Sequence, residues 1–189
     1  MADVRYQIAV DAEPDAGLSD DIAEMEVSQT IEGPTTFRVR FAVDICGEDM
    51  EPLEDPRLKP GDPDTLITVM AFVDGRTHVL AHGIITERQA KLEKGGAGSF
   101  LDIQGTDRRA IMEREERRTS HTGLASDVVS GIFATYGFEA DVAPTEIEYS
   151  EGTNALSQTE NDFAFVEQLA GRNGMRVWID WAADVGFAG

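Results

Sequence analysis

Apolar and polar side chains alternate along most of the first 105 residues, and this two-residue period constrains the fold more than any other feature of the chain. Such a period places apolar side chains on one face of a β-strand and polar side chains on the other. Turn-forming pairs such as Gly33-Pro34 and Asp74-Gly75 separate the runs. The predicted strands lie at 4–10, 23–31, 37–45, 66–73, 78–86 and 100–105. Five or six hairpin-connected strands can close into a small antiparallel barrel, which leaves few open edges.

Two segments of this region have no such period. Residues 48–64 are rich in proline and acid, which predicts a surface loop. Residues 91–98 (KLEKGGAG) predict a flexible hairpin tip. The glycines in this tip lack both the Gly-Lys-Ser/Thr of a phosphate loop and the spacing of a dinucleotide site.

Beyond Gly105 the apolar residues follow a helical period, which predicts two helices and a strand. The first apolar stripe consists of Val128, Val129, Ile132, Phe133 and Tyr136. Ser126 is its candidate N-cap and Gly137 its left-handed stop. The second stripe consists of Phe163, Val166, Leu169 and Ala170, with Thr159 or Ser157 as the cap and Asn173-Gly174 as the end. Met175, Val177, Ile179 and Trp181 then alternate as a last strand.

The two halves together predict an α+β fold. An N-terminal antiparallel β-barrel occupies residues 1–105, and an α/β subdomain of two helices and a strand occupies residues 106–189. A chain of 189 residues can bury one good core, or one core and a small second one.

The charge of the chain restricts its partners. Its 36 acidic and 16 basic residues give a net charge of −20, so its general field does not favour duplex nucleic acid or anionic membranes. No apolar run approaches the roughly 18 residues of a membrane span, and no secretory signal is visible. A solitary Cys46 excludes an internal disulfide. The acidity fits either adaptation to high salt or a GC-rich genome combined with an acidic partner-facing surface.

No pattern in the sequence predicts catalysis, a metal site or a cofactor. His78 and His82 are four residues apart, which on a strand is about 13 Å, too far for one zinc ion without a bend at Gly83. Ser120-His121 lacks the Gly-x-Ser-x-Gly elbow of a hydrolase nucleophile. The acids of the 48–64 loop do not match a helix-loop-helix calcium site.

The arginine segment and the two tryptophans are the candidate subunit contacts. Arg108, Arg109, Arg114, Arg117 and Arg118 alternate with acids. This pattern suits either a helix with internal ion pairs or a cationic contact with an acidic neighbour. Trp178 and Trp181 would lie on opposite faces of the last strand, so one of them is exposed or covered by another subunit.

Residues 105–181 closely resemble the baseplate hub family, which includes phage late control protein D, the myovirus tail hub and the hub portion of VgrG-type spike proteins. The resemblance lies in the order of the following residues: Asp107, Arg108, Arg109, Ser126, Asp127, Val128, Tyr136, Gly137, Gln158, Asn161, Asp162, Phe163, Leu169, Ala170, Asn173 and Gly174. Lys59-Pro60-Gly61-Asp62 also looks like the family's entry into its central hairpin.

The resemblance implies a structural role rather than an enzymatic one. It implies a barrel related to the tail-tube subunit, and three copies in a ring that joins the inner tail tube to the central spike. Other baseplate proteins would be further partners, and the protein would assemble in the cytoplasm and end in a virion or injection-system particle.

The chain departs from the family in its length. Family hubs continue beyond the Trp178 region with more of this subdomain and a second barrel, so the resemblance covers the front part of a hub. The chain is then either a partial hub or one half of a split hub. Two other classes stay open: a tail-tube or tube-initiator protein that forms hexameric rings, and a baseplate-associated hydrolase of cell-wall glycans.

Overall fold

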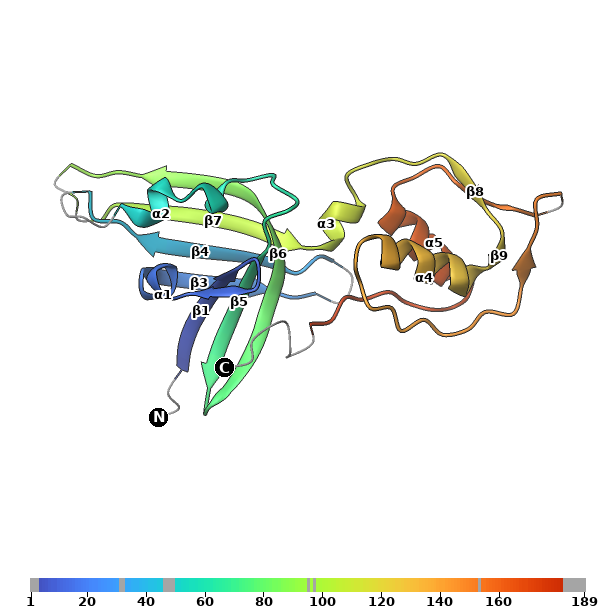
Figure 1. The fold of residues 1–189 in the computed structure, drawn as a ribbon, viewed down its shortest axis with the longest axis horizontal. Coiled ribbons are helices and arrows are strands. Elements are labelled where there is room, and N and C mark those ends of the chain that lie inside the picture. Colours follow the sequence, from blue (N-terminus) through green and yellow to red (C-terminus); the bar gives the residue numbers. More distant parts are fainter. Residues whose placement is uncertain are drawn as a thin grey trace. The chain divides into compact units, whose positions relative to one another are not determined.

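A computed structural model describes residues 4–30, 33–45, 50–94, 96, 98–152 and 154–181 of the chain. Cys46, the start of the predicted loop at Glu48, Gly95, Ala97 and residues 182–189 lie outside this part. The chain divides into two compact units, which we describe separately (Figure 1). The first runs to Arg108 and includes the chain again from Asp180; the second spans Arg109–Ile179.

The first unit contains a seven-stranded antiparallel sheet with the order β2-β1-β5-β6-β7-β4-β3. Its strands are β1 (Val4–Val10), β2 (Glu13–Asp15), β3 (Ile22–Ser28), β4 (Thr36–Ala42), β5 (Ile67–Val73), β6 (Arg76–Lys91) and β7 (Phe100–Asp107). Helix α1 (Ala16–Asp20) connects β2 to β3. The predicted strands are therefore present, and β6 is longer than expected.

Two bulges bend the sheet at β6. The register shifts opposite Val69/Met70 and again between Ile85 and Glu87, so Leu80 and Thr86 are extra residues in β6. Bulges of this kind bend and twist a strand. Figure 1 shows the result: β1, β5 and the first part of β6 run across the direction of β4 and β7. The core lies within this bend and includes Ile8, Phe41, Ile67, Ile85 and Ile103.

The predicted closed barrel is not found in the described residues, where the sheet is open. In the described residues β3 does not pair with β1 or β2. The edge of β1 is instead covered in part by β2 and α1: the Ile8 N–H donates to Ser19 Oγ at 3.1 Å, and Leu18 is fully buried beside it. Strand β2 and helix α1 thus occupy this edge of β1 only at Ile8–Val10.

The region predicted as a long loop contains local structure. Helix α2 (Glu51–Glu54) and the 3₁₀ turn η1 (Pro56–Leu58) lie between β4 and β5. The buried Asp55 caps η1 by accepting from the Arg57 N–H, and the Arg57 side chain bridges Asp55 and Asp15. The Asp74-Gly75 turn is confirmed, since both residues have positive φ, 50° and 78°.

The second unit consists of helices packed on short strand pairs. The helices are α3 (Arg109–Met112), α4 (Ala125–Thr135) and α5 (Asp162–Arg172). The strands are β8 (Thr119–His121) with β11 (Leu156–Gln158), and β9 (Gly123–Leu124) with β10 (Glu148–Tyr149). The core of this unit includes Met112, Ile132, Phe133, Phe163, Phe165, Val166 and Leu169.

The ends of α4 and α5 show which local signals were correct. Gly137 and Gly174 follow the two helices with φ of 68°, as predicted. Both N-caps were wrong. Ser126 lies inside α4 and hydrogen-bonds to Thr145, while Asn161 caps α5 by accepting from the Ala164 N–H at 2.8 Å.

A further prediction in this unit was wrong, and the structure excludes one of the two alternatives for the arginine segment. Residues 175–181 do not form a strand with any described part of the chain. The arginine segment is not a helix with internal ion pairs, because α3 ends at Met112. The chain beyond it pairs with the start of α5, through a bridge between Glu116 and Asn161 and a hydrogen bond from the Arg117 N–H to the Glu160 carbonyl at 3.2 Å.

No helix in the described residues is long and apolar enough to cross a membrane.

Candidate functional site

A polar network centred on Asp162 connects the helices and strands of the second unit. Asp162 begins α5 and is 3% exposed. Its Oδ2 accepts a hydrogen bond from the Tyr136 hydroxyl at 2.6 Å and pairs with Arg117 Nε at 3.2 Å. Its Oδ1 accepts from Gln158 Nε2 at 2.7 Å. A buried carboxylate requires such partners, because leaving it unpaired costs several kcal/mol by general estimates.

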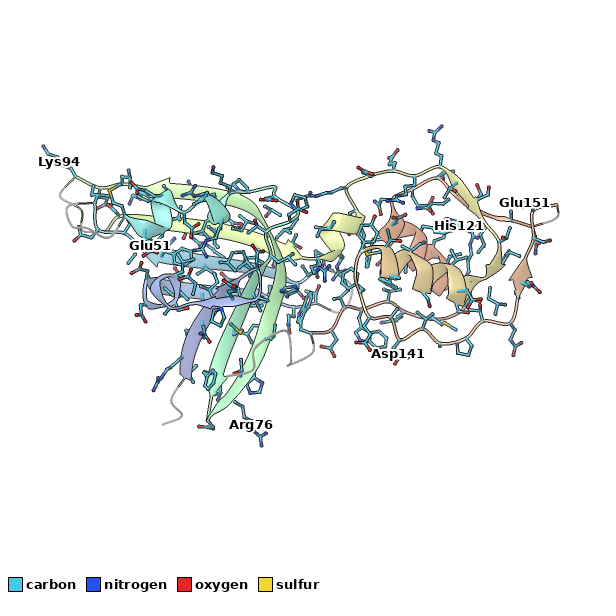
Figure 2. The ribbon with its side chains drawn as sticks, in the orientation of Figure 1. Glu51, Arg76, Lys94, His121, Asp141 and Glu151 are labelled. Carbon is cyan, nitrogen blue, oxygen red and sulfur yellow. The ribbon has the colours of Figure 1, made fainter. Side chains whose placement is uncertain are left out.

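The network continues from Gln158 to His121. Gln158 Nε2 donates to both Asp162 and the Glu160 carbonyl, so its Oε1 is the acceptor for His121 Nε2 at 2.9 Å. His121, labelled in Figure 2, also stacks on Phe165 of α5 with ring centroids 5.2 Å apart. The histidine proton on Nε2 is thereby used for a structural hydrogen bond.

The network favours the neutral form of Tyr136. Burial, followed by the hydrogen bond to Asp162, raises the pKa of Tyr136 to about 12. The phenol therefore remains a hydrogen-bond donor across the physiological range, which suits a structural role rather than acid–base chemistry.

A surface cavity of about 270 Å³ opens beside this network. Its lining includes Arg117, His121, Asp127, Gln158 and Asp162. The polar groups of Gln158 and Asp162 are already engaged with neighbours from the same unit. In the described residues no group of three or more His, Cys, Asp or Glu side chains could hold a metal ion.

Other residues that carry the family resemblance also have structural contacts. Asp107 is fully buried and accepts from the Thr35 N–H at 2.7 Å, which connects the end of β7 to the start of β4. The Arg109 guanidinium lies 5.0 Å from the centre of the Phe163 ring.

The candidate contact residues differ in exposure and in their contacts. Arg114, Arg117 and Arg118 are exposed, but Arg117 also pairs with Asp162 of its own unit. Trp178 is 74% exposed, whereas Trp181 is half-buried.

His82 is a buried neighbour of Trp181 in the first unit. Its Nδ1 lies 2.9 Å from Thr68 Oγ1, and its ring meets the edge of Trp181 at a centroid distance of 5.8 Å. Burial, with a smaller contribution from Arg108, lowers the pKa of His82 to about 4. His78 is exposed, so the two histidines do not share an environment.

The outward face of β4 and β7 carries an ion-pair cluster. Asp102 is buried there between Arg38, at 2.6 Å, and Arg40, at 2.8 Å, and Arg40 also pairs with Glu24 of β3 at 3.0 Å. The hydrogen bond from Arg40 is the main cause of the lowered pKa of Asp102. This cluster explains why polar residues alternate with the core residues of β4.

A second exposed feature is apolar. Val4 and Tyr6 are 46% and 50% exposed on one face of β1, and Phe72, which is paired with Arg5, is 39% exposed on the opposite face of β5. All three lie on the part of β1 and β5 that extends away from β4 and β7 (Figure 1). Figure 2 shows Arg76 at the free end of the β5–β6 hairpin. The sequence marked β1 as a half-buried strand but could not indicate that the core ends partway along it.

The sequence analysis missed the network around Asp162. Tyr136, Gln158 and Asp162 carried the family resemblance, yet nothing in their spacing indicated that they meet. The only local signal was polar residues next to an apolar helical stripe.

The fold resembles that of a tail protein. No protein-family model and no curated protein sequence matches the chain. A tail protein from Neisseria meningitidis MC58 aligns with a TM-score of 0.56 and 12% identity, over 94% of this chain and 48% of that one. The chain thus spans about half the length of that tail protein.

A second solved structure is the E. coli c3393 protein. It is described as a component of the type VI secretion system with structural similarity to the T4 bacteriophage tail proteins gp27 and gp5. It aligns with a TM-score of 0.44 and 12% identity, over 90% of this chain and 40% of that one.

Proposed function

We propose that the chain is a structural baseplate hub protein of a contractile phage tail or injection system. Three copies would form a ring that joins the inner tail tube to the central spike, with assembly in the cytoplasm before incorporation into the particle. The observation that carries the proposal is the tail-protein fold, which extends over 94% of the chain and so includes both units. The chemistry of such a protein is the burial of interfaces rather than catalysis.

The exposed features of the chain supply candidate contacts. Trp178 is a large apolar side chain at the surface, of the kind that contributes strongly to interfaces. Arg114 and Arg118 present cationic groups on an otherwise acidic molecule, which favours contact with an acidic partner. Arg117 also serves its own unit, and a test of the interface should spare it.

The native mass of the chain by light scattering, in low and in multi-molar salt, tests the proposal. A trimer supports the hub function, and mixing with an inner tube protein should then give a stable cap. A hexamer would instead favour a tube or tube-initiator protein. A monomer at every salt concentration would contradict self-assembly into a ring.

Charge reversal tests the arginine contact separately. The variants Arg114→Glu and Arg118→Glu should reduce the trimer fraction. Lys94→Glu, with the same change of charge in the first unit, is the matched control. An unchanged oligomer mass in the arginine variants would reject this contact and leave the hub proposal standing.

Incubation with peptidoglycan tests the hydrolase alternative. We expect no release of fragments, and measurable release would replace the structural proposal with an enzymatic one.

A further inference from the structure

The sheet of the first unit has two edges that no described strand fully covers. On one side β2 pairs only with Ile8–Val10 of β1, and the Ile8 N–H is bonded to Ser19. The stretch from Val4 to Gln7 therefore has a described strand partner only on its β5 side. On the other side β3 pairs only with β4. Uncovered edges are sites at which a further strand can pair.

The backbone of β1 offers hydrogen bonds at its open edge. Ile8 directs its N–H away from β5 toward Ser19, and Val10 pairs with Glu13 on that same side. Because successive residues of a strand point their backbone groups to opposite sides, Tyr6 and Val4 direct theirs outward as well. No described residue pairs with these groups on the outward side.

The side chains of β1 separate by face. Val4 and Tyr6 lie on the same face as Ile8, yet they are 46% and 50% exposed while Ile8 is fully buried. The core therefore ends between Ile8 and Tyr6, and an apolar surface continues past it. Arg5 and Gln7 occupy the opposite face.

The side chains of β3 separate in the corresponding way. Met25 and Val27 are half-buried against the same core cluster that contains Ile8. Glu24 and Glu26 lie on the opposite face and are exposed, next to Arg40 and Arg38 of β4.

We propose that the open edge of β1 in one copy pairs with the β3 edge of a second copy. The inference rests on the proposed hub function for its partner, another copy of the chain. Joining the edges with the core faces aligned brings Val4 and Tyr6 beside Met25 and Val27. It also brings the cationic Arg5 to the face that carries Glu24 and Glu26. Both faces of the joined sheet are therefore complementary.

This contact uses different surfaces on the two copies. Such a head-to-tail contact closes into a ring when the rotation between copies allows it. The sheet would then pass from one copy to the next, which removes the open edges that an isolated sheet carries.

Disulfide trapping tests the pairing directly. In a Cys46→Ser background, Tyr6→Cys is combined in turn with Met25→Cys and with Val27→Cys, and the protein is oxidised mildly. We expect a covalent ladder between copies, up to a closed ring, for the pair in the correct register. The control pair Tyr6→Cys with Glu26→Cys places its thiols on opposite faces and should give no ladder. Each single-cysteine variant should give dimers at most.

Three results would overturn the inference. A disulfide within one chain would show that β3 closes on β1 of the same copy as a barrel. The absence of any ladder at a concentration where light scattering shows a ring would show that the ring uses another surface, and the hub proposal would survive. A native mass of a monomer at every salt concentration would remove the ring proposal and this pairing together.

A proline variant measures, independently of disulfide trapping, how much the β1 edge contributes to the affinity between copies. Val4→Pro removes an N–H that points outward and spares the hydrogen bonds to β5. It should raise the apparent dissociation constant between copies by about tenfold, because one or two hydrogen bonds between the copies are lost. The melting temperature of the monomer should not change. An unchanged dissociation constant would contradict the pairing.

Discussion

At the scale of single residues, Asp162 connects three parts of the second unit to the start of α5. Its carboxylate accepts hydrogen bonds from Tyr136, which follows α4, and from Gln158 of β11. It also forms an ion pair with Arg117, which precedes β8. Removing the carboxylate takes an acceptor away from the Tyr136 hydroxyl and from the Gln158 side-chain amide. The cost of such a change exceeds the value of any one of the bonds.

We therefore expect Asp162→Ala to lower the free energy of unfolding by roughly 3 kcal/mol, the range typical of breaking a buried pair. Urea denaturation measures the change. The matched control is Asp141→Asn, an exposed acid of the same unit (Figure 2), which should change stability by less than about 0.5 kcal/mol. Equal effects of the two substitutions would show that the Asp162 network does not stabilise the unit.

We expect the buried His82 to make the folded chain less stable at acidic pH. Its pKa is lowered to about 4 in the folded chain, mainly by burial, against an ordinary value of 6.5. Below about pH 6.5 the unfolded chain binds a proton that the folded chain does not, so stability decreases as the pH falls from 6.5 toward 4. The full loss over this window is roughly 3 kcal/mol.

Unfolding at about pH 7 and about pH 5 measures this effect. Between these values the wild type should lose about 2 kcal/mol more than His82→Gln, which has no imidazole to protonate. The variant His78→Gln is the control, because His78 is exposed and should leave the pH dependence as in the wild type. The carboxylates that titrate in the same range cancel in the comparison.

At the scale of elements, some glycines lie where two backbones approach closely, and others lie beside open space. A Cβ on Gly83 of β6 would lie 1.9 Å from the Thr106 carbonyl oxygen of β7, which belongs to the backbone and cannot rotate away. A Cβ on Gly131 of α4 would meet no heavy atom within 4 Å.

We expect opposite results from the same substitution at these two glycines. Gly83→Ala should destabilise the first unit by about 2 kcal/mol or more, because the strands must separate. Gly131→Ala should stabilise α4 by roughly 0.5–1 kcal/mol, the difference in helix propensity. Thermal unfolding of the two variants checks both signs, and a gain at Gly83 would contradict the close approach of β6 and β7.

The elements also show why some boundaries were predictable. The stops at Gly137 and Gly174 depend on a backbone conformation that glycine adopts without steric cost, so the sequence reveals them locally. The strand predicted at 175–181 keeps its alternation of half-buried and exposed residues, but no described strand pairs with it. Strand formation depends on a neighbour, and the period of a single segment does not supply one.

At the scale of the whole molecule, the net charge of −20 determines the response to salt. Like charges repel in the compact state, and this repulsion weakens as the screening length falls from about 30 Å at 0.01 M to about 10 Å at 0.1 M. We expect the melting temperature to rise by a few degrees over this range, since about 1 kcal/mol shifts it by roughly 2–4 °C at this size.

Extending the salt series into the multi-molar range separates the two explanations of the acidity. A melting temperature that continues to rise indicates adaptation to high salt. Full stability at low salt contradicts it and favours a GC-rich source with an acidic partner-facing surface.

The sequence alone determined the α+β class, the positions of six of the seven strands of the described sheet, the helical stripes of α4 and α5 and the resemblance to hub proteins. These properties depend on side-chain period, turn residues and residue order, all of which are local. Only the tertiary structure decided that the sheet stays open at β1 and β3, because edge pairing depends on where α1 and its Ser19 lie. It also decided that Asp162, Gln158 and Tyr136 meet, since a buried carboxylate takes its partners from segments that only the folded chain brings together.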